Sequence, residues 1–335
     1  MIKLTSRFVS CRFLLSALSL TGLFFMSACS QKTLENKAQM PMSDSSSTAE
    51  YRLGDARFNV QVVTEIDPTA ARFEKWGQRF DRSAAVTAIT FNGHQMVNQL
   101  GLPDEYGQLG VGVIGFDDAA SGETFIKPGV GVMVKPGSDA YRSSNRYDFV
   151  LTLEVTVEKL ADQLVVKQVS PDVRGYAFVL IKTYEVDTKS NTLVITYQLS
   201  NVGKRAFELE HYNHNFLTLD NKPFGQQYHI TLGKPIPSLP HSWMHMAGNR
   251  LVIEGDPGAV GFVQVNEPFT ATQADLKMMT ADGKLGIELT GDMPAYRFAH
   301  FFTAKSYSPE RFTRVSLAPD EQVSWQARYY FLHND

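Results

Sequence analysis

The residues best suited to chemistry lie in one short polar segment, Glu210–Phe216, with the sequence EHYNHNF. If this segment is a β-strand, side chains two residues apart share a face. One face then carries Tyr212, His214 and Phe216, and the other carries His211, Asn213 and Asn215. Two aromatic rings beside an imidazole make a platform on which a sugar can stack while the polar group binds its hydroxyls. The alternative is that the two rings belong to the core and His214 is a buried, hydrogen-bonded histidine.

The residues before this cluster predict the elements that must hold it in place. Residues 193–200 alternate along the chain and are rich in β-branched side chains, which is typical of a strand. Asn201 and Gly203 follow and tolerate the positive φ angles that a turn requires. The polar cluster is therefore expected on a second strand that begins after this turn.

Other patterns that carry chemistry are missing or have the wrong spacing. His211 and His214 would face opposite sides of a strand, so they are not expected to bind one metal ion. The acidic pair at 117–118 lacks the spacing of a helix-loop-helix calcium site, and no Gly-x-Ser-x-Gly nucleophile motif occurs. The formal net charge is −3 and no basic run is present, so we expect no nucleic-acid partner. We also expect no metal and no cofactor.

The rest of the chain after residue 50 consists of short runs rich in Val, Ile, Phe, Tyr and Thr, which are typical of strands. Turn pairs such as Asn92-Gly93 and Asp282-Gly283 separate these runs. No long segment has a convincing helical period, although Thr272–Met279 could form one or two helical turns. With 335 residues, of which 43% are hydrophobic, the chain can bury a large core. The pattern predicts one all-β domain over residues 51–335.

Residues 1–29 predict a targeting signal and not a part of the fold. Basic residues precede an apolar run that is shorter than the ~20 residues of a comfortable membrane span. The run ends in Met26-Ser27-Ala28-Cys29, which resembles a bacterial lipobox. That resemblance implies cleavage before Cys29, lipidation of its thiol and a lipid anchor in a membrane. Ser30 at the next position implies the outer membrane, with the domain facing the periplasm.

Residues 30–50 are polar and contain a Ser/Thr cluster, so we expect a flexible tether between the anchor and the domain. The cysteine content agrees with this organisation. Cys11 and Cys29 are the only cysteines in the sequence, so the mature chain would keep Cys29 alone. A disulfide and a cysteine nucleophile are therefore excluded from the mature domain.

The order of these features resembles the galactose mutarotases, or aldose 1-epimerases. In that family a strand ending in a Thr-Asn-x-Gly turn precedes an Asn-His-containing segment that carries the catalytic histidine. The matching residues here are Ser200-Asn201-Val202-Gly203 and Asn213-His214-Asn215-Phe216-Leu217. Residues 84–94 look like the hairpin that opens such domains. The resemblance implies a large antiparallel supersandwich of the galactose mutarotase-like type.

The resemblance also implies roles for individual residues. His214 would be the general acid of an aldose 1-epimerase-like isomerase and would protonate the ring oxygen of the sugar. The family's base is a glutamate on a strand near the C-terminus, and the strand predicted around 297–305 contains none. Either Glu310 in a following loop acts as the base, or His300 does, or no base exists. Without a base the protein would be a non-catalytic carbohydrate-binding or structural envelope protein.

The remaining candidates would bind the substrate, a sugar or a uronic acid. Arg79 and Arg82 lie near the place of the family's arginine, and the sequence does not decide between them. Tyr212 and Asn213 flank the histidine. Trp243 ends a proline-rich loop at 234–243, where it would either stack on a sugar ring or cap the edge of the sandwich.

Overall fold

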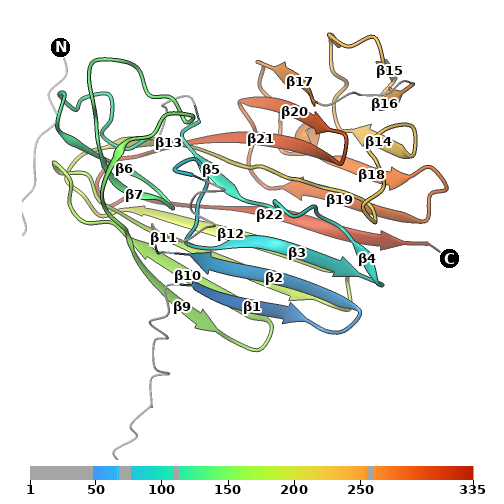
Figure 1. Cartoon of the computed structure of the whole chain (residues 1–335), viewed down its shortest axis with the longest axis horizontal. Coiled ribbons are helices and arrows are strands. Elements are labelled where there is room, and N and C mark those ends of the chain that lie inside the picture. Colours follow the sequence, from blue (N-terminus) through green and yellow to red (C-terminus); the bar gives the residue numbers. More distant parts are fainter. Residues whose placement is uncertain (1–47, 66, 68–76, 109–112, 255–259, 335) are drawn as a thin grey trace, which may run out of the picture. The chain divides into compact units, whose positions relative to one another are not determined.

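The computed structural model describes residues 48–65, 67, 77–108, 113–254 and 260–334 (Figure 1). The expected signal peptide, Cys29 and all but the last three residues of the expected tether lie outside these ranges. Within them, the regular elements are antiparallel strands and one short 3-10 helix at Thr272–Ala274. The predicted all-β class is therefore confirmed.

The described strands form four sheets, two of which are large. The ten-stranded sheet has the order β15 (Met244–Ala247), β16 (Arg250–Ile253), β14 (Tyr228–Leu232), β18 (Leu276–Thr280), β19 (Leu285–Gly291), β22 (Gln322–His333), β12 (Thr192–Asn201), β11 (Phe178–Asp187), β10 (Gln163–Val169) and β9 (Glu154–Lys159). The five-stranded sheet has the order β17 (Val260–Val265), β20 (Arg297–Thr303), β21 (Ser306–Leu317), β13 (Phe207–Asn213) and β5 (Asp104–Tyr106).

The two smaller sheets come from the first half of the domain. The four-stranded sheet contains β1 (Thr48–Gly54), β2 (Phe58–Glu65), β3 (Ala85–Phe91) and β4 (His94–Gln95) in chain order. The three-stranded sheet contains β6 (Thr124–Lys127), β7 (Gly131–Val134) and β8 (Asp148–Leu151). In the view of Figure 1, β1, β2 and β3 overlap strands of the ten-stranded sheet, and β1 contacts β10 and β11.

The centre of the ten-stranded sheet shows why these sequences form strands. Burial alternates residue by residue along β11 and most of β12, as expected when one face packs on a core and the other does not. The turn that joins them contains Asn191 at φ 56°, which asparagine tolerates better than most residues. β12 then pairs with β22 over nine residues, from Thr192 opposite Tyr330 to Ser200 opposite Gln322.

One apolar core takes residues from all four sheets. It includes Val60 from the four-stranded sheet, Leu180 from the ten-stranded sheet, and Leu209 and Val315 from the five-stranded sheet. Burial of apolar area at this scale is the main favourable term in folding. The five-stranded sheet is thus held on the core by one face, and its opposite face is available to carry a site.

The predicted strand–turn–strand segment is present, but its two strands belong to different sheets. β12 pairs with β11 and β22, whereas β13 pairs with β21 and β5. The turn is tight because an added Cβ at Gly203 would lie only 2.5 Å from the backbone nitrogen of Ala177. Asn201 caps it by accepting a hydrogen bond from the Gly203 N–H at 3.0 Å. The chain crosses from one sheet to the other at this turn.

Two predicted boundaries need correction. β1 begins at Thr48, so the last residues of the expected tether, Thr48–Glu50, are part of a strand that pairs with β2. The segment Thr272–Met279 forms one 3-10 turn and then enters β18 at Leu276, so most of it is not helical. Both segments gain backbone hydrogen bonds from a neighbouring strand, which local sequence does not reveal.

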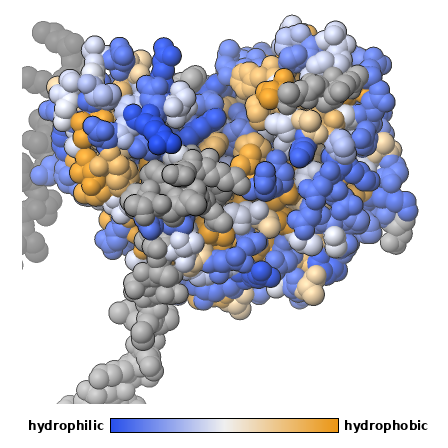
Figure 2. Space-filling model, viewed as in Figure 1, coloured by the Kyte–Doolittle hydropathy of each residue, from blue (hydrophilic) through white to orange (hydrophobic). Residues whose placement is uncertain are grey.

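Hydrophilic residues cover much of the described surface in the view of Figure 2, between smaller apolar patches. The large hydrophobic side chains that are exposed are the adjacent Val150 and Leu151, Val260 and Phe262 of β17, and the single residues Leu160 and Val202. Among the described residues, no helix has the length and apolar character needed to span a membrane.

Candidate active site

The polar cluster of the sequence lies on the five-stranded sheet and continues past the end of β13. Glu210 and Tyr212 project from one face of β13, and the ring of His214 is on the same side, with its centroid 6.1 Å from that of the Tyr212 ring. The neighbouring strands add Glu105 from β5 and Phe312 from β21 to this side. We call this surface of the five-stranded sheet the site face.

His214 and Glu310 form the central contact of the site face. His214 Nε2 lies 3.2 Å from Glu310 Oε1, and Ser308 Oγ lies 2.9 Å from the other ring nitrogen, Nδ1. The His214 ring is bordered by Phe80 and Phe301, both edge-on, and by Phe216. Each ring nitrogen of His214 therefore has a polar neighbour, and Phe216 stacks on the imidazole ring.

Glu310 is on a strand, which corrects the prediction of a loop. It lies in β21 opposite Ala299 of β20, and Ser308 and Phe312 share its face. Pro309 hid this strand in the sequence, because proline normally argues against a central strand. β13 pairs with β21 only from Leu317 to Thr313, so Pro309 lies beyond that ladder, and its carbonyl accepts a hydrogen bond from the Asn215 side chain.

Burial sets the protonation of the pair. His214 is 4% exposed and Glu310 is 2% exposed. Burial, which penalises the charged form, raises the pKa of Glu310 to about 8, although Arg79 opposes this shift. Burial and, secondarily, the charge of Arg79 lower the pKa of His214 to about 3. At neutral pH the contact therefore joins a neutral imidazole and a protonated carboxyl, and the two groups hold one transferable proton between them.

Arg79, and not Arg82, lies beside this pair. Arg79 Nε donates to Glu105 Oε2 at 2.7 Å, and its terminal nitrogen donates to the Tyr212 hydroxyl at 3.0 Å. Tyr212 in turn donates to Glu105. Lys127 approaches Glu105 Oε1 to 4.0 Å. The Arg79 side chain is 35% exposed, so it forms the accessible edge of the site.

A second charged group lies farther along the site face. Arg297 of β20 donates to Glu210 Oε2 at 3.0 Å, and its guanidinium lies 3.5 Å from the centre of the Phe312 ring. Tyr296 also donates to Glu210. Burial raises the pKa of Glu210, and Arg297 opposes that shift. The site face thus carries a row of paired ionisable groups.

A buried network on the other side of β13 fixes the strand in place. Lys182 of β11 donates to Asp81 at 2.7 Å and to Asp104 of β5 at 3.1 Å. His211 Nε2 lies 3.0 Å from Asp104, and the Trp325 Nε1–H donates to His211 Nδ1 at 3.1 Å. Because Nδ1 accepts, the proton of a neutral His211 must be on Nε2. These bonds connect the ten-stranded and five-stranded sheets beneath the site.

Asn213 belongs to that network and does not face the site. Its amide donates to Asp104 Oδ1 and to the Tyr197 hydroxyl, on the side of β13 opposite Tyr212. The predicted binding role of Asn213 is therefore replaced by a structural one. Tyr212 does lie on the site face, although its hydroxyl already binds Glu105 and Arg79.

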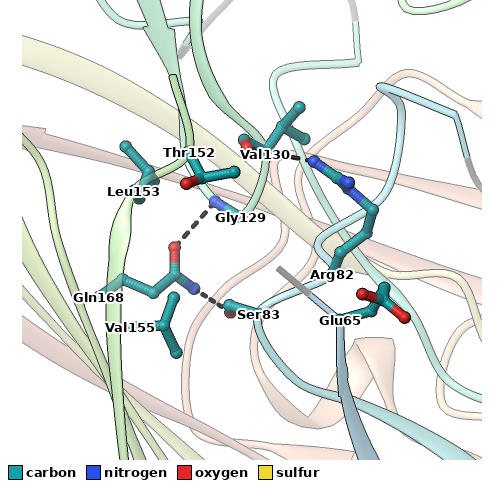
Figure 3. Close-up of a pocket in the computed structure, with 9 residues that line it drawn as sticks. All are labelled: Glu65, Arg82, Ser83, Gly129, Val130, Thr152, Leu153, Val155 and Gln168. Carbon is teal, nitrogen blue, oxygen red and sulfur yellow. Dashed lines mark hydrogen bonds between the residues drawn. The ribbon is translucent and has the colours of Figure 1, made fainter. Parts of the chain in front are cut away.

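Arg82 lies in a different part of the molecule. Figure 3 shows it beside Glu65, donating to the Val130 carbonyl, with Gln168 bridging Ser83 and Gly129 nearby. Arg82 is 1% exposed, and burial lowers its pKa to about 10. Of the two arginines that the sequence analysis named, Arg79 bonds Glu105 and Tyr212 on the site face, whereas Arg82 bonds the Val130 carbonyl.

His300 and Trp243 also lie away from the pair. On β20 the neighbours of His300, Ala299 and Phe301, point to the site face, so His300 points to the opposite side. There its Nδ1 bonds the Tyr307 hydroxyl at 2.6 Å, and burial lowers its pKa to about 3. Trp243 packs edge-on against Phe302, on that same opposite side. Trp243 therefore covers the sheet, which is the alternative that the sequence analysis gave.

The contacts that the sequence analysis missed are those of Ser308, Phe301 and the Glu210–Arg297 pair. Glu210 could have been found, since it is two residues from Tyr212 and four from His214 on a predicted strand. Ser308 and Phe301 come from strands whose register the sequence does not give. In the part of the chain that the structure describes, no group of three His, Cys, Asp or Glu side chains is arranged to bind a metal ion.

Comparison with solved structures identifies the architecture. The structure matches a GalM/aldose epimerase homologue from C. elegans with a TM-score of 0.53 and 12% identity, over 86% of this chain and 100% of that chain. It matches a galactose mutarotase-like protein from Clostridium acetobutylicum with a TM-score of 0.52 and 12% identity, over 86% and 98% of the two chains. The fold is galactose mutarotase-like.

The predicted supersandwich type is thereby confirmed. No protein-family model and no curated protein sequence matches the chain. At 12% identity the likeness establishes the galactose mutarotase-like fold alone, so the chemistry must be argued from the residues on the site face.

Proposed function

We propose that the protein interconverts the anomers of an aldose or a uronic acid, with His214 and Glu310 as the proton-transferring pair. The observation that carries this proposal is the 3.2 Å contact between the two side chains on the site face. Mutarotation opens and closes the pyranose ring by removing a proton from O1 and delivering one to the ring oxygen. It needs one donor and one acceptor, which the neutral pair supplies together.

The closeness of the pair suits this reaction. O1 and the ring oxygen are bonded to the same carbon atom, so a donor and an acceptor that are neighbours can reach both. In the free protein the proton starts on Glu310, and His214 is the acceptor. This reverses the roles that the family resemblance implies. When the ring closes on the other face, both transfers run backwards and the pair returns to its first state.

Substrate binding would use the residues at the accessible edge. The Arg79 side chain is partly exposed and its guanidinium can bind hydroxyl or carboxylate oxygens, and Phe80 and Phe301 are partly exposed rings on which a sugar can stack. His214 and Glu310 are almost fully buried, so a sugar reaches them only when a side chain at the accessible edge moves aside.

A carbohydrate-binding protein without catalysis is the second candidate, and the burial of the pair favours it. The strand predicted around 297–305 does lack a carboxylate, but Glu310 on the neighbouring strand β21 lies opposite its Ala299. Both candidates predict sugar binding, and only the first predicts faster anomer exchange.

Polarimetry of freshly dissolved α-galactose, α-glucose and α-galacturonic acid tests the proposal. We expect the wild type to accelerate at least one of these mutarotations, and His214→Gln to lower the rate by about 10²–10⁴-fold. Glu158→Gln, which removes an exposed carboxylate on β9, is the matched control and should keep the wild-type rate. Sugar binding without any rate increase would support the second candidate.

We also propose that the chain is anchored by lipid on Cys29 in the outer membrane, with the domain in the periplasm. The lipobox-like sequence and Ser30 support this proposal. Mass spectrometry of the mature N-terminus tests it directly. A diacylated or triacylated Cys29 is expected, and an unmodified chain that still begins at Met1 would contradict the proposal.

A further inference from the structure

Ser308 is the polar group nearest the His214–Glu310 pair that has been given no role. It is fully buried, and its hydroxyl lies 2.9 Å from His214 Nδ1 and 3.4 Å from Glu310 Oε1. With the 3.2 Å contact between His214 Nε2 and Glu310 Oε1, the three side chains form a closed triangle. Ser308 and Glu310 lie two residues apart on β21, so the strand itself sets their spacing.

Counting the protons on Ser308, His214 and Glu310 shows what the Ser308 hydroxyl can do beside the pair. A serine hydroxyl can donate one hydrogen bond and accept others, and it rotates to suit its neighbours. When Glu310 is protonated and His214 is neutral, three protons are available for the three sides of the triangle. When the proton has moved to His214, the imidazolium donates to both partners and Ser308 still donates its proton to the Glu310 carboxylate. Three protons again fill three sides.

We propose that Ser308 is a positioning residue that orients the His214 ring and keeps the triangle hydrogen-bonded whichever partner holds the shared proton. This inference rests on the proposed anomer exchange, in which the proton must leave one partner and return. The other neighbours of the ring, Phe80, Phe216 and Phe301, contribute aromatic rings and cannot replace the hydroxyl at Nδ1.

The charged groups around Glu310 bear on how Ser308 acts. Arg79 and Arg297 favour its ionised form, and Glu105 disfavours it. The hydrogen bond from Ser308 also favours the ionised form, so the hydroxyl lowers the pKa of Glu310 relative to a site without it. Removing the hydroxyl should therefore raise the pKa of Glu310 above about 8.

The test compares Ser308→Ala with Ser306→Ala in the full-length chain. Ser306 is also buried on β21, but its hydroxyl bonds Thr303 and not the pair, so it is a matched control. The first measurement is the ¹⁵N NMR spectrum of the histidine rings, with His214 assigned by its loss in His214→Gln. The second is the pH titration of the Glu310 carboxyl by ¹³C NMR, and the third is kcat and KM for anomer exchange.

For Ser308→Ala we expect a shifted His214 Nδ1 resonance, a higher pKa of Glu310, and a kcat lowered by about 2- to 10-fold with KM little changed. Ser306→Ala should leave all three values as in the wild type. Ser308→Thr, which keeps a hydroxyl, should restore the resonance position and most of kcat. If Ser308→Ala does not fold, Ser308→Cys replaces it, because a thiol is a weaker donor of similar shape.

Unchanged Nδ1 and Glu310 signals in Ser308→Ala would overturn the proposal, whatever the activity. A wild type that is inactive on every sugar, with Ser308→Ala still moving these signals, would instead refute the proposed function. In that case Ser308 still orients the His214 ring, but it has no role in anomer exchange.

Discussion

Replacing Glu310 with glutamine should make the protein more stable at alkaline pH and change its stability near pH 4 by only about 1 kcal/mol. The carboxyl is 2% exposed, and burial raises its pKa from an ordinary value of 4.5 to about 8. Folding therefore favours the protonated form. Glutamine has nearly the same shape and remains neutral at every pH, so the variant lacks the cost of burying a charge.

The sign and size follow from proton linkage. The pKa of Glu310 is higher in the folded protein than in the unfolded chain. Its contribution to the free energy of unfolding is therefore fully present below pH 4.5 and is lost as the pH rises to about 8. At about 1.36 kcal/mol for each pKa unit, the loss is about 3 kcal/mol at pH 7 and approaches about 5 kcal/mol by pH 9. The hydrogen bonds that glutamine changes add an offset of about 1 kcal/mol that does not vary with pH.

Urea unfolding of both proteins from pH 4 to pH 9 measures this difference. We expect the free energy of unfolding of Glu310→Gln, relative to the wild type, to rise by several kcal/mol across the range and to level off above pH 8. Glu158→Gln, on the exposed strand β9, should show no comparable rise. If the free energies of unfolding of the wild type and Glu310→Gln change with pH in parallel, the Glu310 carboxyl is not held protonated by burial. The proposed reaction could then not start with the proton on Glu310.

Three further substitutions distinguish residues of the site from residues that only stabilise the fold. Lys182→Met should lower the free energy of unfolding by about 3–5 kcal/mol in urea titrations, because Asp81 and Asp104 stay buried without their shared cation; a smaller loss would contradict that network. His300→Gln should leave kcat within about twofold of the wild type, since the ring faces away from the pair. Trp243→Ala should lower Tm through lost packing and keep kcat, and a large loss of kcat in either variant would place that residue in the site after all.

The strand pattern made much of the fold predictable. Alternating β-branched runs located most strands of the ten-stranded sheet, because one face of each packs on the core. The same period of two predicted Tyr212, His214 and Phe216 on one side, although β13 itself ends at Asn213. β1 and β18 were missed or shortened because their sequences lack a strong pattern, and pairing with neighbours decides their structure.

The partner of His214 was named by the sequence only as one of two alternatives. Pro309 broke the strand pattern of β21 and made Glu310 look like a loop residue. His300 was the rival, and one residue of register separates it from Ala299, which faces the site. Register depends on pairing between segments far apart in the chain, so no local signal could decide between the two. For the same reason, no local signal in the sequence could decide between Arg79 and Arg82.

Anomer exchange measured by NMR for the wild type, His214→Gln, Glu310→Gln and the double variant tests the central claim most directly. Two groups that transfer protons as one unit lose activity together, so the double variant should be about as slow as either single variant, each down by about 10²–10⁴-fold. Single variants that keep the wild-type rate, or losses that multiply in the double variant, would contradict the claim that His214 and Glu310 act as one pair.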